Sequence, residues 1–407
     1  MSRSLQILRP KLVGRRWLST TLPRCNSEAQ AIEEEFQSTA RKFCRDEIVP
    51  NAPKFDQTGE YPWDIVKKAH SLGLMNTDTP EEYGGLNLTL AAKTKIYEEI
   101  AYGDTAIGTS LMVNELAQIP ILYAGSDYLK EKYMGWNVKE PILAAYCTTE
   151  ADAGSDVANA KTKAVKDGDD YILDGTKVWI SNCGLAKWYF VLAKTDAGAS
   201  PSKAFTGFIV DRDLPGVSVG KKEKNMGQRC SDTRSLTLEG VRVPSKNIVG
   251  KVGQGFLLAM RAFDRTRPIV ASMGCGVQQR CIDEAGQYAV TRKCFGKPIA
   301  DHQGTGFKLA DMAVNLEASR LLVEKAARKV DSQADDATYY SSIAKVFSTD
   351  NAFKAACEAV QIFGGNGFNT EYPVEKLLRD SKILQIYGGT SEIQRLVVSR
   401  KVASLYK

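Results

Sequence analysis

Two segments of the sequence combine glycine with small hydroxyl side chains, a composition suited to holding the phosphates of a cofactor. Thr148, Thr149 and Ser155 lie in the first segment, and the second is the run Gly-Gly-Asn-Gly at 364–367. Hydroxyl groups and unhindered backbone amides both donate hydrogen bonds to phosphate oxygens. The glycine run is equally typical of a flexible connection between helices. No G-x-G-x-x-G follows a predicted strand, so a Rossmann-type dinucleotide site is not indicated.

The cysteines and histidines do not indicate a metal centre. The chain has nine cysteines, no C-x-x-C pair, and two histidines, His70 and His302. Zinc sites use closely spaced groups of such ligands, so we expect no metal. The odd number and irregular spacing of the cysteines are typical of reduced thiols in a matrix-type compartment.

Three regions of different apolar patterning must position these residues. From 27 to 139 apolar side chains recur at helical spacing, as in Ile32, Phe36 and Ala40. From 141 to 249 short runs of strand-forming residues alternate with turns, and a hairpin is predicted at Asp174-Gly175. From Gln254 onward the pattern is again helical. The order predicts an α-β-α arrangement whose late helices can form an up-and-down bundle.

One apolar stripe in the last region predicts an amphipathic helix. Its members are Phe307, Ala310, Val314, Ala318 and Leu321.

The net charge of +6 is concentrated at the N-terminus. Six arginines and lysines precede the first acidic residue, Glu28, and without them 48 basic residues balance 48 acidic ones. The neutral remainder does not indicate nucleic-acid binding. No apolar run approaches the ~20 residues of a membrane span. The Arg- and Ser-rich, acid-free start is typical of a mitochondrial presequence, with a disordered basic tail as the alternative.

Motifs along the chain resemble those of the acyl-CoA dehydrogenases. The segment TEADAGSD at 149–156 resembles the family's T-E-x-x-A-G-S-D signature, and QIFGGNGF at 361–368 matches a second signature. Between them, in the family's order, lie WIS at 179–181, MGQRCSDTR at 226–234 and RKCFG at 292–296. The resemblance runs from residue 27 to the end and is closest to the medium-chain, mitochondrial branch.

This resemblance implies an α+β, mainly helical fold with a targeting presequence at 1–25 and three domains. These are an N-terminal helical domain at 26–140, a middle β-barrel-like domain at 141–250 and a C-terminal four-helix bundle at 251–407. It also implies FAD, a homotetramer, a place in the mitochondrial matrix and electron delivery to electron-transfer flavoprotein. The expected activity is oxidation of saturated acyl-CoA to trans-2-enoyl-CoA in fatty-acid β-oxidation.

The residues that match FAD-binding positions of similar proteins form three groups. Those around the flavin ring are Tyr146, Thr148, Thr149, Gly154, Ser155, Trp179, Ile180 and Ser181. Arg292 and Gln303 match positions that touch the FAD of a neighbouring subunit, and the candidates Cys294 and His302 lie close to them in the sequence. The remainder are Gln361, Gly364, Gly365, Gly389, Thr390, Ser391 and Glu392. Without the motif, Trp179 reads as a barrel-core aromatic and Arg292 as a solvated surface charge.

The residues that match acyl-CoA contacts lie in two places. They are Ser155, Asp264, Arg265, Thr266, Arg267, Tyr387 and Gly388. Arg267 would serve the nucleotide part of CoA, with a solvated charge as the alternative.

The position of the family's catalytic base is vacant. Dehydrogenation begins with removal of a weakly acidic α-proton, which needs a positioned carboxylate. Medium-chain relatives supply it within I-Y-E-G-T, where this chain has Gly388. Long-chain and isovaleryl types place a glutamate at the position that aligns with Thr266. The backbone N–H of residue 388, which in the family donates to the thioester oxygen, remains.

Three interpretations follow from the vacancy. Another carboxylate, such as Asp264 or Glu392, replaces the base; or turnover is slow with water as the base; or the protein binds acyl-CoA without oxidising it. Asp264 lies two residues from Thr266, about 200° around a helix, so we expect it to point elsewhere. An acyl-CoA oxidase is a weaker alternative.

Overall fold

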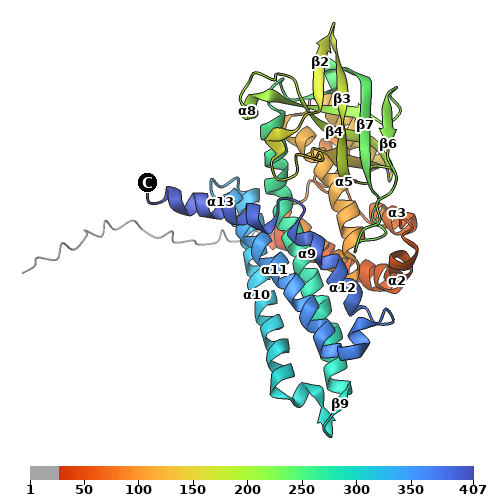
Figure 1. Ribbon diagram of the computed structural model, residues 1–407, viewed down its shortest axis with the longest axis vertical. Coiled ribbons are helices and arrows are strands. Elements are labelled where there is room, and N and C mark those ends of the chain that lie inside the picture. The colour runs from red at the N-terminus through yellow and green to blue at the C-terminus, as the bar shows by residue number, and fades with distance from the viewer. Residues whose placement is uncertain (1–26) are drawn as a thin grey trace, which may run out of the picture.

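The computed structural model of the protein describes residues 27–407. The presequence predicted at 1–25 lies outside these residues. The α+β, mainly helical fold class is confirmed, with helices on either side of a central sheet along the chain. In Figure 1 the strands lie at the top and the long C-terminal helices run downward.

The first region is helical. Asp104 begins α5 by accepting hydrogen bonds from the N–H groups of Ala106 and Ile107, at 2.6 and 3.2 Å. Helix α5 is buried over most of its length because it lies between the sheet and the other helices. The helices are α1 (Ser27–Phe43), α2 (Val49–Thr58), α3 (Trp63–Ser71), α4 (Leu90–Gly103), α5 (Thr105–Ala124), α6 (Asp127–Leu129) and α7 (Gly135–Lys139).

The middle region forms one eight-stranded sheet of order β6-β7-β3-β2-β4-β5-β8, with β1 paired to β4. Its elements are β1 (Leu143–Cys147), β2 (Lys163–Asp167), β3 (Asp170–Ser181), β4 (Ala186–Lys194), α8 (Pro201–Ala204), β5 (Phe205–Asp211), β6 (Val217–Val219), β7 (Thr233–Pro244) and β8 (Ile248–Val249).

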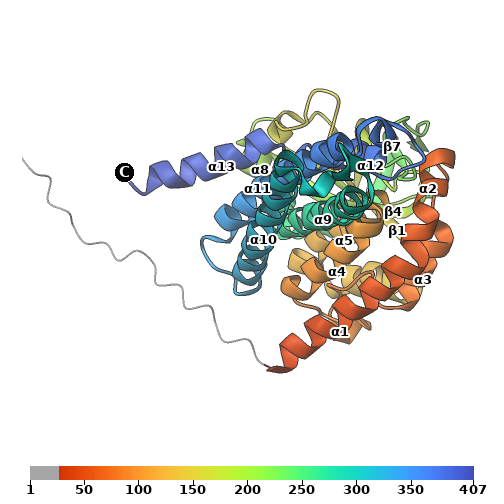
Figure 2. The ribbon, with the colours of Figure 1, turned by 90° about the horizontal axis from the view of Figure 1, so that it is seen from below.

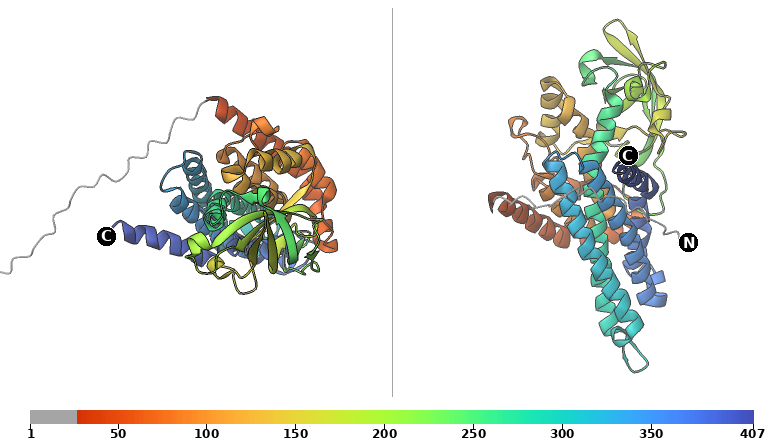
Figure 3. Two further views of the ribbon diagram at one scale, coloured as in Figure 1. Left: turned by 90° about the horizontal axis from the view of Figure 1, so that it is seen from above. Right: turned by 90° about the vertical axis from the view of Figure 1, so that its left-hand side faces the viewer.

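Strand β4 is buried on both faces, which explains its nearly continuous apolar sequence. Trp188 and Phe190 pack with α5 and the start of α9 (Gly255–Thr291), whereas Tyr189 and Val191 pack inside the sheet against Leu238 of β7. The sheet therefore curls around a core of its own. Seen from above, it covers the upper end of the helices (Figure 3).

The predicted hairpin at Asp174-Gly175 is wrong. Strand β3 continues through these residues, and the hairpin lies earlier, where β2 pairs with β3 around Gly168. Gly175 instead marks a bulge in the pairing of β3 with β7. Its φ of 150° and its closeness to Thr162, 2.5 Å from where a Cβ would lie, explain why glycine stands there.

The third region is built on three long helices, α9, α10 (Gln303–Asp331) and α11 (Ala337–Phe363), which pack together. Helices α12 (Val374–Ser381) and α13 (Ser391–Ser404) pack on α11. Pro268 lies inside α9. The short strands β9 (Lys293–Cys294) and β10 (Lys297–Pro298) form the tip at the lower end of α9 (Figure 1). Helix α13 projects away from the body (Figure 2).

The predicted apolar stripe of α10 faces outward. Phe307, Val314 and Leu321 are exposed, and the buried face of the helix carries Met312 and Leu316 instead.

Candidate functional site

The segment that carries Thr148, Thr149 and Ser155 is fixed to β3 by a buried ion pair. The Glu150 carboxylate accepts hydrogen bonds from Lys177 Nζ at 2.8 Å and from the Thr162 hydroxyl at 2.6 Å. Burial alone would raise the pKa of Glu150, but Lys177 and these hydrogen bonds lower it to about 2. The Thr149 carbonyl also accepts from Val178 N at 3.0 Å. Residues 148–150 therefore lie beside the part of β3 that carries Trp179 and Ser181.

Trp179 has the features of a cofactor platform rather than of a core residue. Its side chain is 64% exposed, so the barrel-core interpretation is wrong. Its φ of 59° lies in the left-handed region, which is costly for a bulky residue and tends to persist at functional sites. Ser155 and Gly154 are also exposed, while Thr148 and Ile180 are buried. An exposed aromatic beside small polar residues fits the expected flavin.

Residues 386–390 form a turn with two consecutive left-handed glycines, Gly388 at φ 64° and Gly389 at φ 88°. Helix α13 begins directly after it, with Thr390 Oγ1 accepting from Ile393 N at 3.3 Å. Within residues 27–407 the N–H of Gly388 makes no hydrogen bond. This N–H is available to a ligand.

The space beside Gly388 is open. A Cβ at this position would have, apart from its chain neighbours, one described atom within 4 Å, Val270 Cγ2 at 3.9 Å. Val270 lies four residues after Thr266 on α9, so both occupy the same face of that helix. The two positions where relatives carry a base therefore adjoin the same space.

The nearby carboxylates in sequence are engaged elsewhere. Asp264 accepts from Arg267 Nη1 at 2.7 Å and from the Thr338 hydroxyl at 2.8 Å, and its burial raises its pKa. Glu392 lies exposed in the first turn of α13. Neither of these carboxylates has an atom within 4 Å of where a Cβ of residue 388 would lie.

The two arginines of the 264–267 segment are not solvated charges. Arg265 pairs with Asp78 of the N-terminal region, its Nε donating at 3.1 Å. Arg267 is buried and its burial lowers its pKa, with Asp264 acting in the opposite direction. Its Nε has no hydrogen-bond partner among the described residues. Arg265 thus joins α9 to the N-terminal helices, while Arg267 keeps an uncommitted donor.

Apart from Gly389, Thr390, Ser391 and Glu392 at the turn before α13, the FAD-binding candidates fall into two sets at opposite ends of α9. The Tyr146 hydroxyl donates to the Ala259 carbonyl at 3.1 Å, which places the first set near the start of that helix. Arg292 follows its last residue, 33 residues and about 50 Å farther along. One chain cannot bring Tyr146 and Arg292 to the same cofactor.

The second set lies together at the lower tip. His302 Nε2 is 3.1 Å from the Cys294 carbonyl, and Arg292, Cys294 and Gln303 are exposed. The glycine run after α11 reaches the same end of α9, because Phe363 stacks on Tyr288 with a centroid distance of 4.1 Å. Gln361, Gly364 and Gly365 are exposed there.

Three polar residues around the Gly388–Gly389 turn were not predicted from the sequence. Lys345 and Gln394 donate to its carbonyls, and Asp350 binds residues on both sides of it. The only sequence signal for Lys345 is its position among small residues on the buried face of α11.

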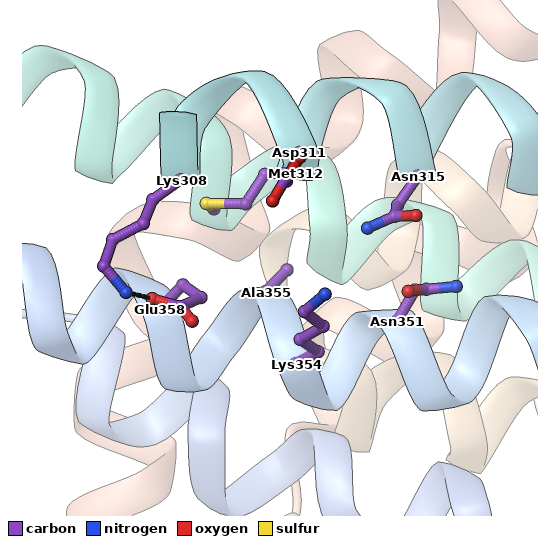
Figure 4. A pocket seen from close by; sticks show the side chains of 8 residues that line it. All are labelled: Lys308, Asp311, Met312, Asn315, Asn351, Lys354, Ala355 and Glu358. Atoms are coloured by element: carbon purple, nitrogen blue, oxygen red, sulfur yellow. Dashed lines mark hydrogen bonds and ion pairs between the residues drawn. The ribbon is translucent and has the colours of Figure 1, made fainter. Parts of the chain in front are cut away.

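A small pocket between α10 and α11 lies apart from this turn (Figure 4). Six of its eight lining residues are polar or charged, and an ion pair between Lys308 and Glu358 closes one end. In the described part of the chain no helix is long and apolar enough to cross a membrane.

Comparisons with known proteins match all three regions of the chain. Family models of the acyl-CoA dehydrogenase N-terminal, middle and C-terminal domains match residues 30–138, 145–241 and 253–403. A "probable medium-chain specific acyl-CoA dehydrogenase 2, mitochondrial" of Caenorhabditis briggsae is 50% identical over 377 residues, 90% of each chain.

Solved structures give the same result. Butyryl-CoA dehydrogenase from Megasphaera elsdenii superposes with a TM-score of 0.89 at 36% identity, over 91% of this chain and 98% of that one. A glutaryl-CoA dehydrogenase from Mycobacterium smegmatis in complex with FADH2 gives 0.86 at 25% identity, over 93% and 95%. The chain therefore belongs to the acyl-CoA dehydrogenase family, oxidoreductases that act on CH–CH groups.

Proposed function

We propose that the protein binds FAD and saturated, medium-chain acyl-CoA and oxidises the thioester to trans-2-enoyl-CoA slowly, because it lacks a built-in base. We further propose that it acts in the mitochondrial matrix, as a homotetramer, with electron-transfer flavoprotein as its acceptor. The name of the Caenorhabditis relative supports the chain-length class and the location. The FADH2 complex of the Mycobacterium structure supports the cofactor.

The residues around Gly388 provide one half of the chemistry. Its free N–H donates to the thioester oxygen and stabilises the negative charge that develops there when the α-proton leaves. Trp179 and the hydroxyls of Thr149 and Ser181 would hold the flavin beside this position. The chemistry that FAD supplies when bound is acceptance of a hydride from the β-carbon.

The open space beside Gly388 is the observation that carries the proposal of slow turnover. Proton removal requires an acceptor within hydrogen-bond reach, and among the described residues, chain neighbours apart, Val270 alone has an atom within 4 Å of where a Cβ of residue 388 would lie. Loss of general-base assistance typically lowers a rate by a factor of ~10²–10⁴. The substrate would therefore be bound and polarised, while proton transfer would fall to water.

The separation of the two FAD-binding sets supports the oligomer. Since Tyr146 and Arg292 lie about 50 Å apart along α9, a complete site requires the tip of a second subunit. The exposed apolar stripe of Phe307, Val314 and Leu321 on α10 fits burial in such an assembly.

A flavin spectrum followed by titration with octanoyl-CoA tests the proposal. We expect the purified protein to carry FAD, and octanoyl-CoA to perturb its absorption at once but bleach it only over many minutes. Turnover with an artificial electron acceptor should be far below that of a glutamate-bearing relative. A protein without flavin, or one that turns over at an ordinary rate, would contradict the proposal.

The same vacancy favours a second candidate, a flavoprotein that binds acyl-CoA without oxidising it. In that case the absorption is perturbed and never bleaches, even overnight. Release of hydrogen peroxide during turnover would instead identify an oxidase.

A further inference from the structure

Lys345 is a buried lysine that the chemistry above does not use. It lies on α11 with no exposed surface, and its Nζ donates to the carbonyl of Gly389 at 2.8 Å. No carboxylate among the described residues forms an ion pair with it. Burying a lysine without an ion pair is costly, so its retention calls for a function.

Gln394 binds the same turn from α13. Its Nε2 donates to the Gly389 carbonyl at 2.9 Å and to the Gly388 carbonyl at 3.1 Å. Both carbonyls of the double-glycine turn are therefore held by side chains of neighbouring helices. Two glycines in succession have little conformational preference of their own, so these contacts decide the orientation of the peptide planes.

The residues that flank the turn are fixed as well. The Tyr387 hydroxyl lies 3.2 Å from the Thr109 hydroxyl of α5. Asp350, five residues after Lys345 on α11, accepts from Gln385 Nε2 at 2.7 Å and from the Ser391 hydroxyl at 2.8 Å. The N–H of Gly388 thus lies between an anchored tyrosine and two anchored carbonyls.

We propose that Lys345 is a positioning residue, which holds the Gly388–Gly389 turn so that the N–H of residue 388 points at the thioester oxygen of bound acyl-CoA. This inference rests on the proposed function and specifies how its remaining catalytic element is maintained. The hydrogen bond to Gly389, rather than the charge of the lysine, carries the effect. A neutral donor of similar length should therefore replace Lys345.

The groups that face Lys345 come from three helices. Arg267 of α9 opposes its positive charge, while Asp350 of α11 and Glu392 of α13 favour it. Asp264 in turn pairs with Arg267. Lys345 and Arg267 therefore lie near carboxylates that already bind other groups. The direct hydrogen-bond partner of Lys345 is the Gly389 carbonyl.

The vibration of the substrate carbonyl tests this positioning directly. The probe is a medium-chain acyl-CoA whose β-carbon is replaced by sulfur, which prevents dehydrogenation, with ¹³C at the thioester carbonyl. In the FAD-loaded wild type we expect its infrared C=O band at lower wavenumber than in water. Lys345→Met should lose most of this shift, and Lys345→Gln should retain it.

Lys354→Met serves as the matched control. Lys354 lies nine residues later on the same helix, roughly on the opposite face, in the pocket of Figure 4, and should leave the band unchanged. Flavin content and the unfolding midpoint identify variants that are misfolded. If Lys345→Met is misfolded, Gln394→Leu, which removes the other side chain that donates to the Gly389 carbonyl, replaces it in the test.

Each outcome decides one question. If the C=O band lies at its position in water in both Lys345→Gln and Lys345→Met, the charge of the lysine carries the effect and the proposal is overturned. A C=O band at the wild-type position in Lys345→Met would also overturn the proposal. A wild type that does not bind the probe would contradict the proposed function itself.

Discussion

Gly388 has a left-handed backbone conformation and open space beside it. The conformation and the space together decide how much a substitution of Gly388 costs in stability. Among residues 27–407, chain neighbours apart, a Cβ there would have only Val270 within 4 Å, at 3.9 Å. A φ of 64° is unfavourable for any other residue by about 1 kcal/mol. The site therefore accepts a longer side chain at a modest cost in stability.

Gly388→Glu should raise kcat by a factor of at least ~10². The new carboxylate would enter the open space next to Thr266 and accept the α-proton. Steady-state turnover of octanoyl-CoA with an artificial electron acceptor measures this. Gly388→Ala, which has the same backbone cost and no carboxylate, is the control. Equal activity of the two variants would show that the substrate's α-carbon lies elsewhere.

Lys345 should make stability depend on pH. Burial, followed by the nearby Arg267, lowers its pKa from 10.5 to about 7. Between these values the unfolded chain binds a proton that the folded protein lacks, so the free energy of unfolding rises with pH by up to about 1.4 kcal/mol per unit. Burial of the charged Lys345 therefore lowers the free energy of unfolding by its full amount below pH 7 and has no such effect above pH 10.5.

Urea unfolding at pH 7, 8 and 9 should therefore show a steeper rise for the wild type than for Lys345→Met. The Lys354→Met control should follow the wild type. Parallel profiles for wild type and Lys345→Met would mean that Lys345 titrates near its ordinary pKa.

At the residue scale, the sequence predicts side chains that belong to motifs and misses those that act through packing. Trp179 and Gly388 are predicted site residues because their neighbours match family signatures. Lys345 and Gln394 were not, since a lysine or glutamine in a helix usually faces solvent and only the tertiary structure buries these two against the turn.

At the element scale, β3 depends on the ion pair between Glu150 and Lys177. Both side chains are almost completely buried, so removing one charge leaves the other without a partner. Such a loss typically costs about 3–5 kcal/mol. Because the pair also fixes residues 148–150 beside Trp179, its loss should weaken FAD binding.

Glu150→Gln should accordingly lower the free energy of unfolding by several kcal/mol and reduce bound flavin, as measured by urea unfolding and absorption spectra. Lys161→Ala is the comparison, because its pair with Asp152 lies on the exposed surface of the same segment and should contribute little to stability. Full flavin retention by Glu150→Gln would show that the segment is held by its backbone contacts alone.

Two errors at this scale have physical causes. Asp174-Gly175 has the composition of a hairpin turn, yet long pairing with β7 keeps the chain extended and the glycine serves a bulge. The stripe of Phe307, Val314 and Leu321 has the period of a core-facing helix, yet it faces outward. Periodicity identifies an apolar face and does not say whether the same chain covers it.

At the scale of the whole molecule, the proposed FAD site combines Trp179 of one subunit with Arg292 at the tip of another. Trp179→Ala and Arg292→Ala should each reduce FAD binding when expressed alone. When the two variants are co-expressed in equal amounts, about one quarter of the FAD sites should be intact. Half of the subunit pairs then contain one subunit of each variant, and one of the two FAD sites in such a mixed pair has both Trp179 and Arg292. Flavin content per protein measures the recovery. No recovery would place both residues in sites within one subunit.

Because α9 separates Tyr146 from Arg292, the proposed oligomer would make retention of the cofactor depend on protein concentration. In the proposed oligomer each tip would donate Arg292 across a subunit boundary, so separation of the subunits would expose one flank of every bound flavin. Mass action then favours flavin release on dilution, and added free FAD should shift the balance back toward the assembled form.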